Sequence, residues 1–91
     1  MRLRWTPAAA DALETIADYL AQKIPSFEHA TIRQIYEAIA TLKSMPNRGR
    51  AGSEAGTREL VISRLPYIVV HRVRSDAVEI LHIYHGAREK H

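Results

Sequence analysis

Helical periodicity marks the first half of the chain. The first apolar stripe consists of four residues at spacings of three, one and three: Leu13, Ile16, Ala17 and Leu20. Such spacing places side chains on one face of a helix. Thr6 and Pro7 precede the stripe; a threonine can cap free amide groups, and proline suits the first helical position. The pattern therefore predicts a helix that begins at Pro7 with Thr6 as its N-cap.

A second helix is predicted directly after the first. The segment Ile24-Pro25-Ser26 interrupts the pattern, and Ser26 is the expected N-cap of the new helix. Its apolar seam consists of Ile32, Ile35, Ile39 and Leu42. Pro46 ends the helix, because the residue before a proline disfavours helical backbone. Since the break is short, the two helices are expected to form an antiparallel hairpin.

Strand patterns surround this hairpin. Residues 1–5 alternate weakly, and residues 58–62 and 67–74 have the apolar, β-branched character of strands. Residues 77–85 are mostly apolar on both faces until His85, which is typical of a central strand. Ser75-Asp76 is expected to form the tight turn between the last two strands.

The resulting order is β-α-α-β-β-β. We expect an α+β fold in which the helical hairpin packs on a small, mainly antiparallel twisted sheet, with residues 1–91 forming one domain. The segment 46–57 holds three of the four glycines together with Arg48 and Arg50. A loop of this length is unusual in a small domain and favours a functional role.

Charge changes the interpretation of the second half of the chain. The net charge is +3, and residues 1–45 contribute nothing to it because five basic and five acidic residues cancel. Residues 46–91 carry eight Lys or Arg against five Asp or Glu. This asymmetry favours a polyanionic partner, while the simpler alternative is a basic face in contact with water only.

Composition excludes several classes of protein. The chain contains no cysteine, so it has neither a disulfide framework nor a thiolate metal site. The first residues lack the apolar core of a signal peptide, and no run approaches the ~20 apolar residues of a membrane span. We therefore expect a cytoplasmic protein without membrane contact. His82 and His85 are three apart on a strand and point to opposite faces, so no metal site is expected.

The predicted elements and three segments together resemble a known superfamily. The segments are RELVI (58–62), PYIVVHRV (66–73) and VEILHIYHGAR (78–88). Following two helices and a Gly/Arg loop, they are similar to the RelE/ParE toxins of bacterial type II toxin–antitoxin modules. The resemblance implies a growth-inhibiting toxin that a cognate antitoxin protein binds tightly. It implies either of two activities, metal-independent cleavage of mRNA on the ribosome or inhibition of DNA gyrase without nuclease chemistry.

Of the two activities we expect mRNA cleavage. The resemblance then assigns roles to specific residues. Cleavage by the neighbouring 2′-hydroxyl requires a base, an acid and cations that stabilise the phosphate charge, and it needs no cofactor. His85 is the candidate acid or base, because its reference pKa lies near neutrality. Arg88 resembles a phosphate-stabilising arginine of ribonuclease members, and Arg58 supplies further positive charge. The candidate RNA-binding residues are Arg48, Arg50 and Tyr84.

Structural roles remain open for the same residues. Ile68 occupies the position at which several ribonuclease members have an arginine. In the structural alternative, His85 caps the strand edge. Tyr84 lies on the opposite face of the strand, where its structural alternative is a place in the core. Arg58 has an alternative as the partner of a carboxylate such as Glu59 or Glu79. The alternatives differ in geometry: catalysis requires His85, Arg88, Arg58 and an arginine of the loop to converge on one cleft.

Overall fold

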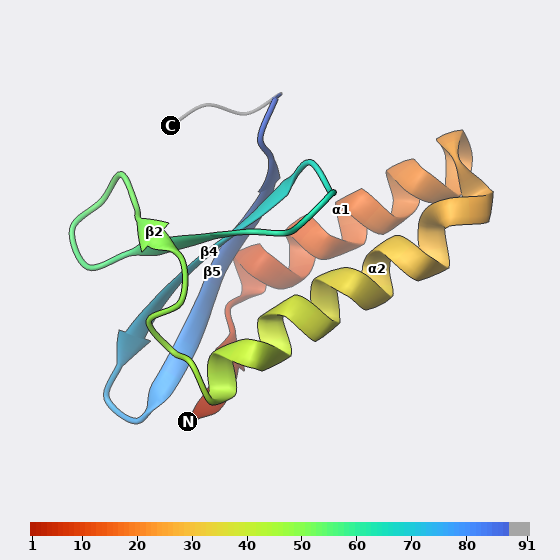
Figure 1. The fold of residues 1–91 in the computed structure, drawn as a ribbon. Coiled ribbons are helices and arrows are strands. Elements are labelled where there is room, and N and C mark those ends of the chain that lie inside the picture. The colour runs from red at the N-terminus through yellow and green to blue at the C-terminus, as the bar shows by residue number, and fades with distance from the viewer. Residues whose placement is uncertain (88–91) are drawn as a thin grey trace.

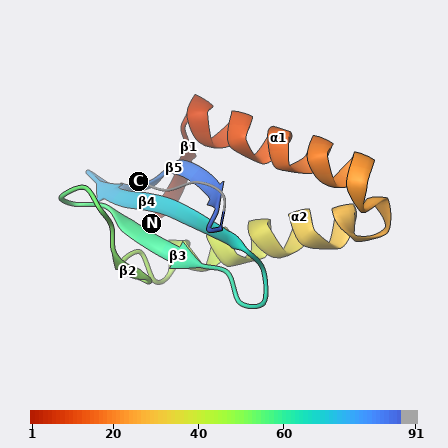
Figure 2. The ribbon, with the colours of Figure 1, turned by 90° about the horizontal axis from the view of Figure 1, so that it is seen from above.

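The structure, a computed structural model, describes residues 1–87 and has an α+β fold. Its elements are β1 (Arg2–Trp5), α1 (Pro7–Lys23), α2 (Pro25–Ala40), the 3₁₀ turn η1 (Thr41–Lys43), β2 (Arg50–Ala51), β3 (Arg58–Val61), β4 (Tyr67–Arg74) and β5 (Ala77–His85). The two helices lie side by side and pack on one face of the sheet (Figures 1 and 2). We call this the helix face, and the opposite side of the sheet the open face. The predicted fold class is confirmed.

The helix boundaries confirm one predicted cap and correct the other. Thr6 caps α1, since its Oγ1 accepts a hydrogen bond from the Ala9 amide at 3.2 Å. The cap of α2 is Ile24, which forms no side-chain capping bond, and Ser26 lies inside the helix. Pro25 explains the difference: its fixed φ suits the first helical position, so the helix begins one residue before the serine.

Strand order and direction complete the sheet. The order is β1-β5-β4-β3-β2, in which β1 runs parallel to β5 and all other neighbours are antiparallel. Strands β4 and β5 have the predicted bounds. The two-residue β2 lies within the segment predicted as a loop and pairs Arg50 with Glu59 and Ala51 with Arg58. It was missed because two residues between glycines carry no alternating pattern.

A β-bulge divides β5. Val70 pairs with His82 while His71 pairs with Ile80, which leaves Leu81 as an extra residue. Thr6 holds this point, since both its amide and its Oγ1 donate to the Ile80 carbonyl, at 3.1 and 2.7 Å. Because of the bulge, Ile80 and Ile83 both face the helices, although they are three residues apart.

The hydrophobic core fills the space between the helices and the sheet. Its fully buried members include Ile35 and Ile39 of α2 and Val69, Ile80 and Ile83 of the sheet. Each such side chain contributes about 1.5–3 kcal/mol through its burial. Among the described residues, neither helix is long and apolar enough to cross a membrane.

Candidate functional site

His85 lies at the end of β5 on the helix face. Its ring meets the ring of Tyr67 edge-on, with centroids 5.5 Å apart. Its Nδ1 accepts a hydrogen bond from the Ala87 amide at 3.1 Å, so the imidazole also orders the turn that follows the strand. This is the structural role that the sequence left open, and it uses one of the two ring nitrogens.

The surroundings of His85 are mainly apolar. The side chain lines a groove of about 370 Å³ between the helical hairpin and the turn that connects β3 and β4. Leu20, Leu65 and Tyr67 contribute to its walls. Ile24 and Phe27, at the junction of the helices, also line it and are 41% and 61% exposed. A groove of this composition suits an apolar protein segment better than a phosphodiester.

Arg58 also lies on the helix face, further along the sheet and opposite the middle of β4. It pairs with His71 in the sheet, and its Nη1 donates to the Gly49 carbonyl at 3.3 Å. The alternative of an ion pair with Glu59 or Glu79 is not realised: both carboxylates lie on the open face, where they pair with other arginines.

Arg48 binds the loop to the end of the second helix. Its Nη1 donates to Thr41 Oγ1 at 2.8 Å. The Arg48 carbonyl accepts from His71 Nε2 at 2.9 Å, which fixes the protonated nitrogen of that imidazole when it is neutral. His71 is 0% exposed. Burial lowers its pKa, the hydrogen bond to Arg48 opposes the shift, and the charge of Arg58 adds to it.

Arg50 and Tyr84 belong to the open face. The Nε and Nη2 atoms of Arg50 donate to Glu59 Oε1 at 3.2 and 3.0 Å. Tyr84 is 4% exposed, as the core alternative predicted, and its ring stacks on His82 with centroids 6.1 Å apart. Burial raises the pKa of the Tyr84 hydroxyl, and the charge of Glu59 adds to this effect.

The described candidates do not share one cleft. His85 is opposite Tyr67 and Arg58 is opposite His71, four residues further along β4. At ~3.3 Å per residue this separates them by about 13 Å along the strand alone. Tyr84 and Arg50 lie on the open face, on the other side of the sheet from His85. Arg88 lies outside the described residues.

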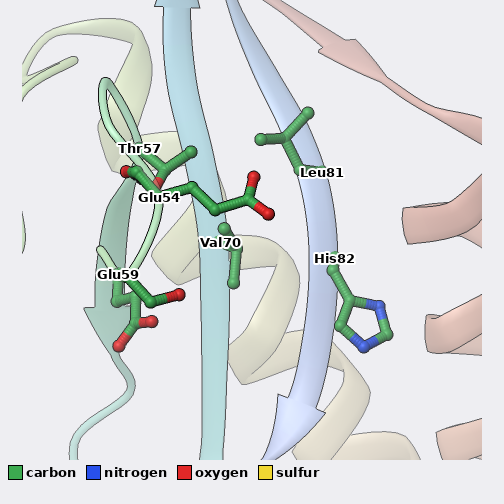
Figure 3. A pocket seen from close by; sticks show the side chains of 7 residues that line it. Glu54, Thr57, Glu59, Val70, Leu81 and His82 are labelled. Atoms are coloured by element: carbon green, nitrogen blue, oxygen red, sulfur yellow. Dashed lines mark hydrogen bonds between the residues drawn. The ribbon is translucent and has the colours of Figure 1, made fainter. Parts of the chain in front are cut away.

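The open face has a hollow of its own near its centre. Figure 3 shows Glu54, Glu59 and His82 around this pocket of about 190 Å³, with the helices behind the sheet. Leu81, the extra residue of the bulge, and His82, which follows it, both line this pocket (Figure 3). Within residues 1–87 no group of three or more His, Cys, Asp or Glu is placed to hold a metal ion. The expected absence of a metal site remains a prediction.

Sequence reasoning missed the strongest ionic cluster of the open face. Glu79 is 3% exposed and lies between Arg4 and Arg72, with N–O distances of 3.1 and 2.7 Å. The hydrogen bond from Arg72 lowers the pKa of the Glu79 carboxyl; burial opposes the shift, while Arg4 and Arg74 reinforce it. Paired arginines at i and i+2, in Arg2/Arg4 and Arg72/Arg74, were the available sequence signal.

Comparisons with known proteins agree on the kind of protein. Residues 3–90 match the sequence model of the "ParE toxin of type II toxin-antitoxin system, parDE". The Y4kP protein of Sinorhizobium fredii (strain NBRC 101917 / NGR234), a candidate toxin by its name, is 35% identical over 88 residues, covering 97% of this chain and 91% of that protein. A solved structure described as the chromosomal ParDE TA system from P. aeruginosa is similar with a TM-score of 0.87 and 31% identity, covering 93% of this chain and 95% of that one.

Proposed function

Because the chain belongs to the ParE toxin family of type II toxin–antitoxin systems, we propose that it arrests growth by inhibiting DNA gyrase. ParE toxins usually act on gyrase, and the sequence resemblance had left this activity open beside mRNA cleavage. Membership of the family therefore favours gyrase inhibition over mRNA cleavage, the activity that we expected from the sequence. A toxin of this kind also has a cognate antitoxin as its partner.

One observation carries the choice of mechanism. Metal-independent RNA cleavage needs the acid–base group and the cations around a single phosphate. On the helix face, His85 and Arg58 are opposite β4 residues that lie four positions apart, and Arg50 lies on the open face in an ion pair with Glu59. His85 also faces an apolar groove. This arrangement supports a toxin that works by binding a protein target, without a catalytic centre.

The test uses the purified protein in two parallel assays. We expect concentration-dependent inhibition of DNA supercoiling by gyrase, and accumulation of cleaved DNA if the gyrase is trapped on its substrate. In a reconstituted translation reaction, primer extension on the mRNA should show no new cleavage sites. Site-specific mRNA cleavage together with normal supercoiling would overturn the proposal.

A His85→Ala variant makes the test sharper. General acid–base catalysis contributes about 10²–10⁴-fold in rate, so a ribonuclease would lose its toxicity with this side chain. Under the gyrase proposal we expect growth arrest to persist within a few-fold, provided that circular dichroism shows an intact fold. His29→Gln, a change at an exposed position of α2, is the matched control. Complete loss of toxicity in a folded His85→Ala protein would return the ribonuclease mechanism to first place.

A further inference from the structure

Four arginines gather on the open face, at the end of the sheet where β4 turns into β5. Arg2 and Arg4 come from β1, and Arg72 and Arg74 from β4. In the sheet, Arg2 and Arg74 are both opposite Ala77, and Arg4 and Arg72 are both opposite Glu79. We call these residues the four-arginine cluster.

The register fixes the layout of this cluster. Within each pair the arginines are two strands apart, which is about 10 Å at the usual strand spacing, and the two pairs are two residues apart along the strands, about 7 Å. The four Cα positions therefore form a rectangle of cations on a rigid sheet. Ala77, in the middle of one pair, is only 2% exposed.

A buried carboxylate holds two of the four side chains in place. Glu79 accepts from Arg72 Nε at 2.7 Å and pairs with Arg4 Nη2 at 3.1 Å. The carboxylate is almost inaccessible, whereas the side chains of Arg4 and Arg72 are 60% and 38% exposed. A ligand that approaches this surface meets guanidinium groups first. The lowered pKa of Glu79, to which Arg4, Arg72 and Arg74 all contribute, is consistent with their convergence.

The cluster also accounts for the charge of the described chain. Without Arg88, Glu89 and Lys90, the 13 basic and 10 acidic residues become eleven and nine, a net charge of +2 for residues 1–87. The four arginines, together with Glu79 and with Asp76, which pairs with Arg2 at 3.4 Å, have the same net charge of +2. The other seven basic and seven acidic residues of this range cancel in number.

We propose that the four-arginine cluster binds the phosphate backbone of duplex DNA. A duplex presents one negative charge per ~1.7 Å of its axis, so a rigid rectangle of this size meets several phosphates at once. Proteins that bind single strands combine cations with aromatic side chains on which the bases stack. No tyrosine or tryptophan of the described open face is exposed beside the cluster, because Tyr84 is 4% exposed and Trp5 belongs to the helix face.

This inference deepens the proposed function, since gyrase is bound to DNA when a toxin would meet it, but its test does not require gyrase. The probe is a fluorescein-labelled 20-base-pair duplex of arbitrary sequence, and anisotropy is measured against purified protein at several salt concentrations. The test variant is Arg2→Gln with Arg74→Gln, which leaves the Arg4–Glu79–Arg72 contacts in place. The control variant is Lys23→Gln with Arg33→Gln, which makes the same change in charge on the helices.

The expected result is specific to the cluster. The Arg2/Arg74 variant should bind the duplex roughly ten-fold more weakly or worse, and the slope of log K against log salt should fall in magnitude by about 2. The control should match the wild type. Equal affinity and slope in the two variants would overturn the inference, and so would tighter binding of a single-stranded RNA of the same length. A toxin that binds DNA here yet leaves supercoiling unchanged would contradict the proposed function only.

Discussion

A single imidazole at the centre of the helix face shows how one residue links the sheet to the loop. His71 is 0% exposed and binds the Arg48 carbonyl through Nε2, while Nδ1 is buried without a hydrogen-bond partner among the described residues. The neutral ring satisfies this geometry, and a second proton would place a charge in the core beside Arg58. The strand therefore requires an uncharged histidine at this position.

The pH dependence of stability follows from this residue. Its folded-state pKa lies below the 6.5 of the unfolded chain, so the unfolded state binds more protons below pH 6.5. We expect the free energy of unfolding to be highest above pH 6.5 and to fall as the pH drops towards 5, by at most ~1.4 kcal/mol per pH unit from this group. Urea unfolding at several pH values measures this change in the free energy of unfolding.

Two variants isolate the contribution of His71. His71→Gln retains an N–H donor but does not titrate, so its stability should change less between pH 6.5 and 5, even if it is lower throughout. His29→Gln, on the exposed surface of α2, should retain the wild-type slope. An unchanged slope in His71→Gln would show that another group causes the pH dependence.

Residue-level chemistry was only partly predictable from the sequence. The Thr6 cap was predictable because a local pattern, threonine before proline, determines it. The complete burial of His71 was not predictable. Strand alternation assigns the side chain to a face of the sheet, but it does not tell how fully the helices and the Arg48 carbonyl cover the imidazole. The ion pairs of Glu79 depend on a parallel β1, and nothing in the sequence fixes which strand lies beside β5.

At the scale of elements, the short β2 depends on a close backbone contact. Gly49 precedes the strand with φ at +108°, and a Cβ there would lie 2.6 Å from the Glu59 carbonyl oxygen. This glycine thus allows the loop to approach β3 so that Arg50 can reach Glu59. Sequence identified the glycine-rich segment, but the pairing depends on contacts between residues about ten positions apart.

Gly49 and Gly56 offer a matched comparison. Gly56 also has a positive φ, of 81°, but a Cβ there would meet nothing within 4 Å. Gly56→Ala should therefore cost about 1–2 kcal/mol for the backbone conformation alone. Gly49→Ala should cost more, because the new methyl group also displaces β3. Thermal melts should show the difference, at roughly 4–8 °C per kcal/mol; equal losses would show that the contact with Glu59 is easily relieved.

At the scale of the whole molecule, the two faces of the sheet differ in chemistry. The helix face ends in an apolar groove lined by Phe27 and His85, and the open face carries the arginines and their carboxylates. We expect the antitoxin to cover the apolar groove, since association is driven mainly by burial of apolar surface.

Phe27 provides the test of this assignment. It is 61% exposed, so Phe27→Ser should leave the fold stable, while loss of a buried aromatic anchor should weaken antitoxin binding by about ten- to a hundred-fold. Val73→Ser, which changes a residue 39% exposed at the other end of the sheet, is the control. Co-expression with the neighbouring reading frame and titration calorimetry measure the affinity. If both variants bind equally well, the antitoxin lies elsewhere.

Because of the bulge at Leu81, the effect of deleting a residue from β5 depends on where the residue lies. Leu81 has no partner in the pairing with β4. The alternation of side chains between the two faces is therefore shifted by one residue after it. A chain that lost Leu81 would have Val78, Ile80, Ile83 and His85 on one face by simple alternation. Loss of Tyr84 would instead move His85 from the helix face to the open face. Within this strand, the bulge at Leu81 is thus where the chain can lose a residue while His85 stays on the helix face.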